Sequence, residues 1–586
     1  MRQWMVAAKK SDFYAIAEKF HVDPVVARII RNREVIGEKN IRIYLGGNLS
    51  DLSDPHQMKD MDRLVEILAQ KIRKQAHIRI IGDYDVDGVT SSHLFLTALR
   101  RVGAKVDVVI PHRIQDGYGL SLHLLQQAKE DGVDTILTCD NGIAAIDEIA
   151  WAKAQKMTVL VTDHHAVPFE EHEGRRTEKK SLADAVVNPH QQDCRYPYKE
   201  LCGAGVAWNV IRVLYENYDM DKREAEDLLD FVAMATVCDV MSLTGENRIL
   251  VKEGLKRIRH TKNIGLQALM QACNVQPENI SAYHFGYVLG PCVNATGRLD
   301  TARHALRLFE TGQETEAEEI ARDLVDLNQE RKELTLQGVE MAKKLCEEGG
   351  YENDPVLVLF LPDVHESIAG LIAGRIREMY NRPVFVLTRG EEGVKGSGRS
   401  TENYSMYENM CGCAELFTKF GGHPMAAGLS LPEENVEKFR RKINENCPLT
   451  VEEVCPDIHI DMAMPVGYAS TELVHQFALL EPFGKDNPSP LFADRNLSIS
   501  RMWVIGKNRN VLRMSVLSEY GQPVPVIFFG DVETLFAYFT EKFGQEEVEN
   551  ALHGRKNRIL FSMVYTAKID FYQENENLQL EMKYYR

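Results

Sequence analysis

The stretch HIRIIGDYDVDGVTSSHLFLTALRRVG (residues 77–103) changes from a strand pattern to a helix pattern around three aspartates. A short β-branched run precedes the aspartates, and a helical run follows them. In an extended backbone, side chains two apart share a face, so Asp83, Asp85 and Asp87 are expected to project together at the strand's C-terminal end. Carboxylates this close repel one another unless a cation neutralises them. The stretch predicts a metal-binding loop, and a solvated acidic turn is the alternative.

A D-x-D-x-D-G run also opens the calcium loops of EF-hands, which need a Glu about six residues after the Gly. That position holds Leu94, so we do not expect calcium by this route.

Further strand patterns follow at residues 105–110, 134–140, 157–165 and 184–189, and helical stretches separate several of them. This alternation predicts an α/β fold with a mostly parallel sheet. Asp140 ends the second of these runs, and Asp163, His164 and His165 end the third. Because the carboxyl ends of parallel strands meet at one edge of a sheet, these groups are expected to converge with the first loop on a metal site.

The composition is that of an ordinary globular protein, and 586 residues predict three or more domains. A net charge of −17 argues against a protein that coats nucleic acid, but a local basic groove remains compatible with a nuclease. The 11 cysteines form no paired framework, and the CGC at Cys411 lacks the redox spacing C-x-x-C. With no apolar run of about 20 residues and no secretory signal, we expect a cytoplasmic protein without a membrane partner.

Several strings together resemble one enzyme family. DYDVDG, TCDNG and TDHH look like the successive signatures of the DHH phosphoesterase superfamily. Within it, VVNPHQQDC, LCGAGVAWNVI, ATVCDVMSLTGENR and NATGRL resemble the RecJ-like exonucleases, and GSGRS and FGGHPMAAG resemble that family's DHHA1-type domain. The resemblance runs from about residue 76 to 430 and weakens beyond.

The resemblance and the chain pattern together imply a fold: a parallel-sheet DHH domain, a long helix, a smaller α/β DHHA1 domain and a β-barrel of OB type. A coiled-coil dimer is the disfavoured alternative for the long helix, because its apolar stripe breaks at Arg331. The expected parts are an N-terminal helical region packing on the DHH domain (1–75), the DHH catalytic domain (76–312), the connecting helix (313–350), the DHHA1 substrate-binding domain (351–448) and the OB-like nucleic-acid-binding domain (449–586).

The resemblance also implies a site for two metal ions. Its ligands would be Asp85, Asp87, Asp140, His164, His165 and Asp239, with Asp140 bridging and Asp83 a ligand or close to the ligands. Many relatives carry a further His where this chain has Ile81, and Asp83 is a candidate to compensate. Oxygen and imidazole ligands without thiolate favour Mn²⁺ or Mg²⁺. Two such ions can generate a hydroxide and stabilise the leaving oxygen of a phosphodiester.

A second set of residues matches positions that contact the terminal 5′-phosphate in RecJ-like enzymes: Arg113, Arg298, Ser397 and Arg399. Guanidinium forks suit a phosphate dianion, although each arginine alone could equally form a surface salt bridge. His423 is expected to face the cleft or to be structural. Arg375, with Arg377, either steers the backbone or caps its helix.

The C-terminal part mixes basic and aromatic residues as single-strand binders do. The residues are Arg501, Trp503, Lys507, Arg509 and Arg513. Trp503 could instead belong to the core.

These features predict a 5′ to 3′ exonuclease of DNA repair and recombination, which acts on 5′-phosphorylated single-stranded DNA and releases 5′-mononucleotides. Family resemblance alone implies a single-stranded-DNA-binding protein and a helicase as partners. One alternative is a DHH phosphodiesterase for oligoribonucleotides or cyclic dinucleotides. The other is an inactive replication scaffold, which loss of ligands would mark.

Overall fold

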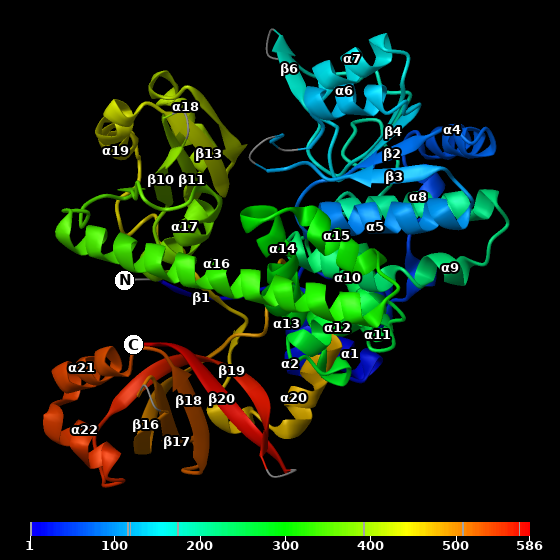
Figure 1. Ribbon diagram of the computed structural model, residues 1–586. Helices are drawn as coiled ribbons and strands as arrows, with labels where there is room; N and C mark the ends of the chain where they lie inside the picture. The colour runs from blue at the N-terminus through cyan, green and yellow to red at the C-terminus, as the bar shows by residue number, and fades with distance from the viewer. Residues whose placement is uncertain are drawn as a thin grey trace. The chain divides into compact units, whose positions relative to one another are not determined.

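The computed structural model describes residues 3–113, 116–117, 119–172, 175–390, 393–506, 509–572 and 575–586 (Figure 1). These residues form two compact units. The first contains Leu52–Met241 and Glu246–Pro456, and the second contains Gln3–Asp51, Ser242–Gly245 and Asp457–Arg586. In the described part of the chain, no helix combines the length and the apolarity that a membrane span requires.

A fully parallel five-stranded sheet lies at the centre of the first unit, in the order β3-β2-β4-β5-β8. Its strands are β2 (Ile78–Ile81), β3 (Val106–Val109), β4 (Thr135–Cys139), β5 (Thr158–Thr162) and β8 (Ala185–Val187). All five coincide with the predicted strand runs, so the parallel α/β fold is confirmed. The chain goes from β2 to β3 on one side and returns to β4 on the other, which makes the carboxyl ends of β2 and β4 a topological switch point.

Helices cover this sheet on both faces (Figure 1). Helix α5 is buried over nearly all its length, because α8 and α10 pack against it while its other side contacts the sheet. The helices of this part are α4 (Met61–Arg73), α5 (Val86–Arg101), α6 (Leu122–Glu130), α7 (Ile146–Ala154), α8 (Gly203–Asn217), α9 (Lys222–Glu226), α10 (Leu229–Cys238), α11 (Gly245–Ile258), α12 (Ile264–Ala272), α13 (Ala282–His284), α14 (Gly290–Leu299) and α15 (Ala302–Glu310). A small hairpin consists of β6 (Phe169–His172) and β7 (Arg175–Glu178).

The predicted connecting helix is a single element, α16 (Glu314–Glu348). It leads into a second five-stranded sheet of order β12-β13-β11-β10-β9, in which only β9 and β10 are parallel. Its elements are β9 (Leu357–Phe360), α17 (Glu366–Tyr380), β10 (Val384–Gly390), β11 (Gly393–Arg399), α18 (Met406–Cys411), β12 (Lys419–His423), β13 (Ala426–Leu431) and α19 (Val436–Glu445). Val339 and Ala342 of α16 share a core with Ile368 and Ile372 of α17.

The second unit is built around a β-barrel. Strand β16 pairs with β17 on one side and with β19 on the other, and this double pairing closes the barrel. Its C-terminal elements are β14 (Ile458–Ile460), β15 (Met462–Ala463), α20 (Thr471–Phe477), β16 (Phe492–Ile505), β17 (Val511–Leu517), β18 (Pro523–Phe529), α21 (Val532–Phe543), α22 (Gln545–Leu552), β19 (Leu560–Tyr572) and β20 (Asn575–Tyr585). The predicted OB-like barrel is therefore confirmed.

The predicted placement of the N-terminal region is partly wrong. Residues 1–75 are predicted to pack on the DHH domain. Residues 52–75, with α4, do belong to the first unit, but β1 (Trp4–Val6), α1 (Phe13–Phe20), α2 (Pro24–Asn32) and α3 (Glu38–Gly46) belong to the second unit. Strand β1 pairs in parallel with β14, and Ile29 and Ile30 of α2 lie in one core with Phe492 of the barrel. Nearness in sequence favoured the wrong domain, because the apolar face of α2 does not specify which surface buries it.

Candidate metal centre and arginine cluster

The aspartates after β2 do not lie on an extended strand. Asp85 is the N-cap of α5, and its side chain accepts a hydrogen bond from the Gly88 backbone N–H at 3.0 Å. Asp87 already lies in the first turn of that helix. The prediction that three alternate side chains share a strand face is therefore wrong. Helix geometry separates them, so that Asp83 and Asp85 join one group of potential ligands and Asp87 joins another.

Gly88 makes this tight turn possible. A Cβ atom at this position would lie 2.4 Å from the carbonyl oxygen of Asp83, which no side chain could tolerate. The glycine of the D-x-D-x-D-G run thus fixes the backbone path that brings the aspartates to the sheet edge.

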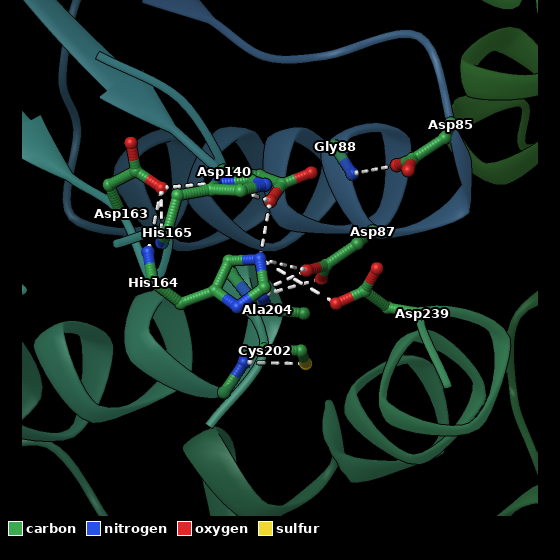
Figure 2. Close-up of polar contacts among 12 residues, drawn as sticks. Asp85, Asp87, Gly88, Asp140, Asp163, His164, His165, Cys202, Ala204 and Asp239 are labelled. Carbon is green, nitrogen blue, oxygen red and sulfur yellow. Dashed lines mark hydrogen bonds and ion pairs between the residues drawn. The ribbon is translucent and has the colours of Figure 1, made fainter. Parts of the chain in front are cut away.

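His164 is the centre of the predicted site (Figure 2). Its Nε2 atom lies 3.1 Å from Asp140 Oδ1, 3.6 Å from Asp239 Oδ2 and 3.7 Å from Asp87 Oδ2. These residues come from the ends of β4 and β5, the start of α5 and the end of α10. Such separations are those expected of ligands that share a cation at about 2.1 Å.

Backbone groups of α8 hold Asp87 in place. Its two carboxylate oxygens accept hydrogen bonds from the N–H groups of Gly203 at 2.6 Å and Ala204 at 2.7 Å. These donors form the first turn of α8, where the helix dipole also favours a negative charge. These two hydrogen bonds fix the orientation of the Asp87 side chain.

Asp163 organises the histidine pair without facing the other carboxylates. Its Oδ1 accepts from the backbone N–H groups of His164 at 2.7 Å and His165 at 3.0 Å, and it lies 2.7 Å from His165 Nδ1. Burial alone would lower the pKa of His165, but the hydrogen bond to Asp163 and the surrounding carboxylates raise it to about 9. For His164, burial outweighs the nearby carboxylates, so the net effect is a lowered pKa.

The seven residues Asp83, Asp85, Asp87, Asp140, His164, His165 and Asp239 are called the metal cluster below. Burial and mutual repulsion raise the pKa of Asp83 and Asp140 well above the usual carboxyl value, and that of Asp85 in the same direction. Buried Asp83 Oδ1 and His164 Nε2 make no hydrogen bond among the described residues, although His164 Nε2 lies near carboxylate oxygens. Divalent cations would satisfy both conditions, because they neutralise the carboxylates and accept the lone pairs.

The metal cluster contains three groups of residues, and within each group the potential ligand atoms lie within 4.8 Å of one another. They are Asp140 with His164 and His165, Asp87 with His164 and Asp239, and Asp83 with Asp85 and Asp140. Asp140 and His164 each belong to two of these groups, so the metal cluster has enough ligands to hold two cations. The donor set is oxygen and imidazole nitrogen, which fits Mn²⁺ or Mg²⁺.

Asp140 has a left-handed backbone conformation, with φ of 61°. This conformation is uncommon outside glycine, although aspartate and asparagine tolerate it. A Cβ atom at Gly203 would lie 2.6 Å from the Asp140 Cβ, so a glycine is needed opposite it. The backbone around Asp140 is therefore held by its neighbours rather than by its own preference.

Three of the predicted phosphate ligands lie together in the first unit as an arginine cluster of Arg113, Arg298 and Arg399. Burial, followed by the charges of neighbouring arginines including Arg113 and Arg399, lowers the pKa of Arg298 to about 10. Burial, with Arg377 and Arg113, lowers the pKa of Arg399. Neighbouring guanidinium groups that lower the pKa of Arg298 and Arg399 create a strongly positive site suited to a phosphate dianion.

A cavity of about 410 Å³ adjoins this cluster, and Tyr84, Arg113, Ser367, Lys395 and Ser397 are among its lining residues. Tyr84 stands between two aspartates of the metal cluster, and the Arg113 guanidinium lies 5.0 Å from its ring centre. The cavity therefore borders the metal loop, which is the segment Asp83–Asp87. The Arg298 guanidinium donates to the carbonyl of Ser367 at 2.7 Å and thereby ties α14 to α17.

Of the predicted phosphate ligands, Arg113 and Ser397 line this cavity, whereas Arg298 and Arg399 do not, and neither do Arg375 and His423. The exposed Arg375 guanidinium lies 3.5 Å from Glu378 of its own helix. His423 is exposed at the end of β12. The charge of Arg377 helps to lower the pKa of Arg399, so Arg377 is the arginine of α17 that contributes to the positive site.

In the second unit, Trp503 lies on β16 directly opposite Arg513 on β17, and Arg501 lies 5.7 Å from its ring centre. Trp503 is 37% exposed, so it is not a core residue. Lys507 lies outside the described residues.

Comparison with known proteins gives the family. Residues 77–236 match the DHH family, N-terminal domain, residues 353–447 match the DHHA1 domain, and residues 460–584 match the RecJ OB domain. The single-stranded-DNA-specific exonuclease RecJ of Haemophilus influenzae is 34% identical over 518 residues, which is 85% of this chain and 88% of that protein. This chain belongs to the RecJ family.

Other RecJ proteins extend the comparison. RecJ of Bacillus subtilis is 33% identical over 87% of this chain, which spans 63% of that longer protein. The crystal structure of Thermus thermophilus RecJ in complex with Mn²⁺ superposes with a TM-score of 0.81 at 25% identity, and covers 100% of this chain and 79% of that one.

Sequence reasoning placed Asp163 at the site but missed its role as the partner of His165, and it missed three other contributors to this RecJ site. The glycines of LCGAG could have indicated backbone donors at a helix N-terminus. Asn294, which accepts from the Val86 N–H at 3.1 Å, and Tyr84 gave no signal of their own. Their roles follow only from α14 lying against the metal loop.

Proposed function

We propose that this RecJ-family chain is a metal-dependent exonuclease that removes 5′-mononucleotides from the 5′ end of single-stranded DNA. One observation carries the proposal: Tyr84 lies between Asp83 and Asp85 of the metal cluster and also lines the cavity that Arg113 of the arginine cluster lines. A terminal phosphate bound by the arginines would therefore place the next phosphodiester beside the metal cluster. A pocket of this kind measures off one nucleotide and requires a free end.

The chain's own residues divide the work. Arg113, Arg298, Arg399 and Ser397 would bind and orient the terminal phosphate. Asp163 holds the His165 ring, and the first turn of α8 holds Asp87, so the ligands are positioned before the substrate arrives. Two Mn²⁺ or Mg²⁺ ions held by the metal cluster would supply the attacking hydroxide and stabilise the leaving oxygen.

A single strand would be preferred because its bases can leave the helix stack and reach aromatic side chains. Trp503, Arg501 and Arg513 combine a partly exposed ring with two cations and are the proposed contacts in the OB domain. His423 and Arg375 remain predicted contacts of the strand backbone. Action in repair and recombination, a cytoplasmic location, and assistance by a single-stranded-DNA-binding protein and a helicase are further parts of the proposal that rest on the family.

Digestion of end-labelled oligonucleotides of both polarities with Mn²⁺, Mg²⁺ or a chelator tests this function. We expect a 5′-phosphorylated DNA strand to be shortened from its 5′ end to mononucleotides, and the chelator to stop the reaction. Shortening from the 3′ end, or cleavage of dinucleotides and cyclic dinucleotides alone, would contradict the proposal. No cleavage of any substrate would favour the inactive scaffold, although the full ligand set argues against it.

A further inference from the structure

A continuous helical segment, residues 282–299, runs through α13, a π-helical turn (Phe285–Leu289) and α14. Arg298 of the arginine cluster lies at its C-terminal end. Single π-turns inside α-helices are rare and are frequent at functional sites. The N-terminal part of this segment has no place in the function described above.

Two exposed tyrosines mark that part. Tyr283 and Tyr287 lie four residues apart, which puts them on one face of the helix. Their rings are stacked at a centroid separation of 5.2 Å and an interplanar angle of 24°. Tyr283 is 62% exposed and Tyr287 is 71% exposed. The stacked pair therefore presents aromatic surface to solvent.

The opposite face of the segment is anchored beside the metal cluster. Phe285 is fully buried, and its carbonyl oxygen lies 3.3 Å from the Sγ of Cys238, the residue before Asp239. A Cβ atom at Gly290 would lie 2.3 Å from that Sγ, so a glycine is needed for this close packing. The tyrosines thus extend outward from the end of α10 that carries a metal-cluster residue.

Farther along, the same segment contacts the metal loop. Asn294 accepts a hydrogen bond from the backbone of Val86, and the missing Cβ of Gly297 allows α14 to approach the carbonyl of Tyr84. Helix rise puts Tyr287 and Arg298 about 16 Å apart along the axis. One helical segment therefore carries the aromatic pair near its N-terminal end, packs at Gly290 against Cys238 beside Asp239, and contacts Val86 and Tyr84 near the C-terminal end that carries Arg298.

We propose that Tyr283 and Tyr287 form a stacking platform for unpaired bases of the substrate strand, on the 3′ side of the bond that is cleaved. The inference rests on the proposed function, because it assigns the 5′ end of the strand to Arg298. Stacking on an aromatic face accepts every base, so the platform would hold the strand without selecting its sequence. An enzyme that shortens single strands of any sequence needs a contact that binds every base.

The test compares the double variant Tyr283→Ala/Tyr287→Ala with Tyr283→Phe/Tyr287→Phe, which keeps both rings. Leu336→Ala removes another large exposed apolar side chain of the same unit and serves as the control. The substrates are 5′-phosphorylated oligonucleotides from two to about twenty nucleotides, with Mn²⁺. For the long strands, we expect the alanine variant to raise KM at least about five-fold with kcat unchanged, and the phenylalanine variant to match the wild type. Dinucleotide cleavage should not change.

Abasic sites placed at one position at a time locate the platform. In the wild type, an abasic site at the stacking position should raise KM by a similar factor, whereas in the alanine variant it should add nothing. Equal KM values for the alanine variant and the wild type on long strands would overturn the inference and leave the proposed function intact. A wild type that degrades no single strand would overturn the proposed function itself. The alanine variant could instead show a raised KM that does not depend on the abasic position, together with a changed sedimentation coefficient. That result would overturn the inference and assign the tyrosines to a contact between two copies of the chain.

Discussion

Asp163 Oδ1 lies 2.7 Å from His165 Nδ1 and also accepts the backbone N–H of His164 at 2.7 Å. One buried carboxylate thus sets both the backbone turn and the orientation of a ring in the metal cluster. Metal-binding histidines are commonly held this way, because the partner fixes the tautomer and increases the basicity of the ligand.

Replacing Asp163 by asparagine keeps the shape of the side chain but removes its charge. We expect Asp163→Asn to raise the Mn²⁺ concentration needed for half-maximal nuclease activity by about 10–100-fold. A metal titration of activity measures this, and circular dichroism checks that the fold is retained. An unchanged titration would show that Asp163 has only a structural role in the turn.

Asp140 offers a sharper test of the metal centre if its left-handed backbone is respected. Asparagine tolerates φ of 61°, whereas alanine adds about 1 kcal/mol of strain or more. We therefore expect Asp140→Asn to abolish cleavage while it keeps single-strand binding. Because burial and neighbouring carboxylates raise the pKa of Asp140, its neutral replacement should also stabilise the metal-free protein. Thermal melting with and without Mn²⁺ reads out both effects, and substantial turnover by this variant would contradict the bridging assignment.

The arginine cluster predicts a preference for a phosphorylated end. We expect Arg399→Ala to reduce the ratio of kcat/KM for 5′-phosphate over 5′-hydroxyl strands by about 10–100-fold, because a hydrogen bond to a charged group is lost. Arg389→Ala is the matched control, since this exposed arginine lies on the same sheet as Arg399 and pairs with Glu433. If both variants keep the wild-type ratio, Arg399 does not bind the end of the strand.

Asp230 predicts a pH dependence of stability away from the metal cluster. Burial raises its pKa to about 6, although Thr261 donates a hydrogen bond to it at 2.7 Å. A raised carboxyl pKa means that the native state prefers the protonated form, so stability falls as pH rises from about 4 to about 6 and stays lower above. We expect Asp230→Asn to be more stable than the wild type by about 1–3 kcal/mol at pH 7.5 and to show no advantage near pH 4. Urea unfolding of both proteins at the two pH values measures the difference in their free energy of unfolding. An equal difference at both pH values would exclude titration of Asp230 as its cause.

The corrected position of the N-terminal helices predicts which unit a core mutation affects. Ile29 is buried in the core of the barrel unit. We expect Ile29→Ala to destabilise the second unit by about 2–5 kcal/mol and to leave Mn²⁺ binding by the first unit unchanged. Hydrogen exchange resolved by segment measures both. Faster exchange in the parallel sheet of the first unit, with the barrel unaffected, would contradict the assignment.

Particular residues explain how much could be predicted from the sequence. The five parallel strands were predictable, because each is a short apolar run with β-branched residues and helices separate most of them along the chain. Asp140, His164 and His165 followed from strand ends at a shared edge. The path of the metal loop was not predictable from spacing, because Asp85 starts a helix instead of continuing the strand.

Long-range packing was the other part that the sequence did not determine. Arg298 is recognisable as a cation, but nothing local indicates that Arg113 and Arg399 lie close enough to depress its pKa. In the same way, the apolar face of α2 predicts burial without naming the barrel as its partner. In both cases the missing information is which surfaces meet after hundreds of residues of intervening chain.

The parallel pairing of β1 with β14 has a consequence for biosynthesis. The backbone N–H of Asp23 donates to Gln476, a residue 453 positions later, so the first helices leave the ribosome long before their partners exist. At about 5–20 residues per second, the delay is roughly 20–90 s. During translation, the amphipathic start of this chain must wait as an exposed apolar segment, and the nascent protein is then a natural client for chaperones.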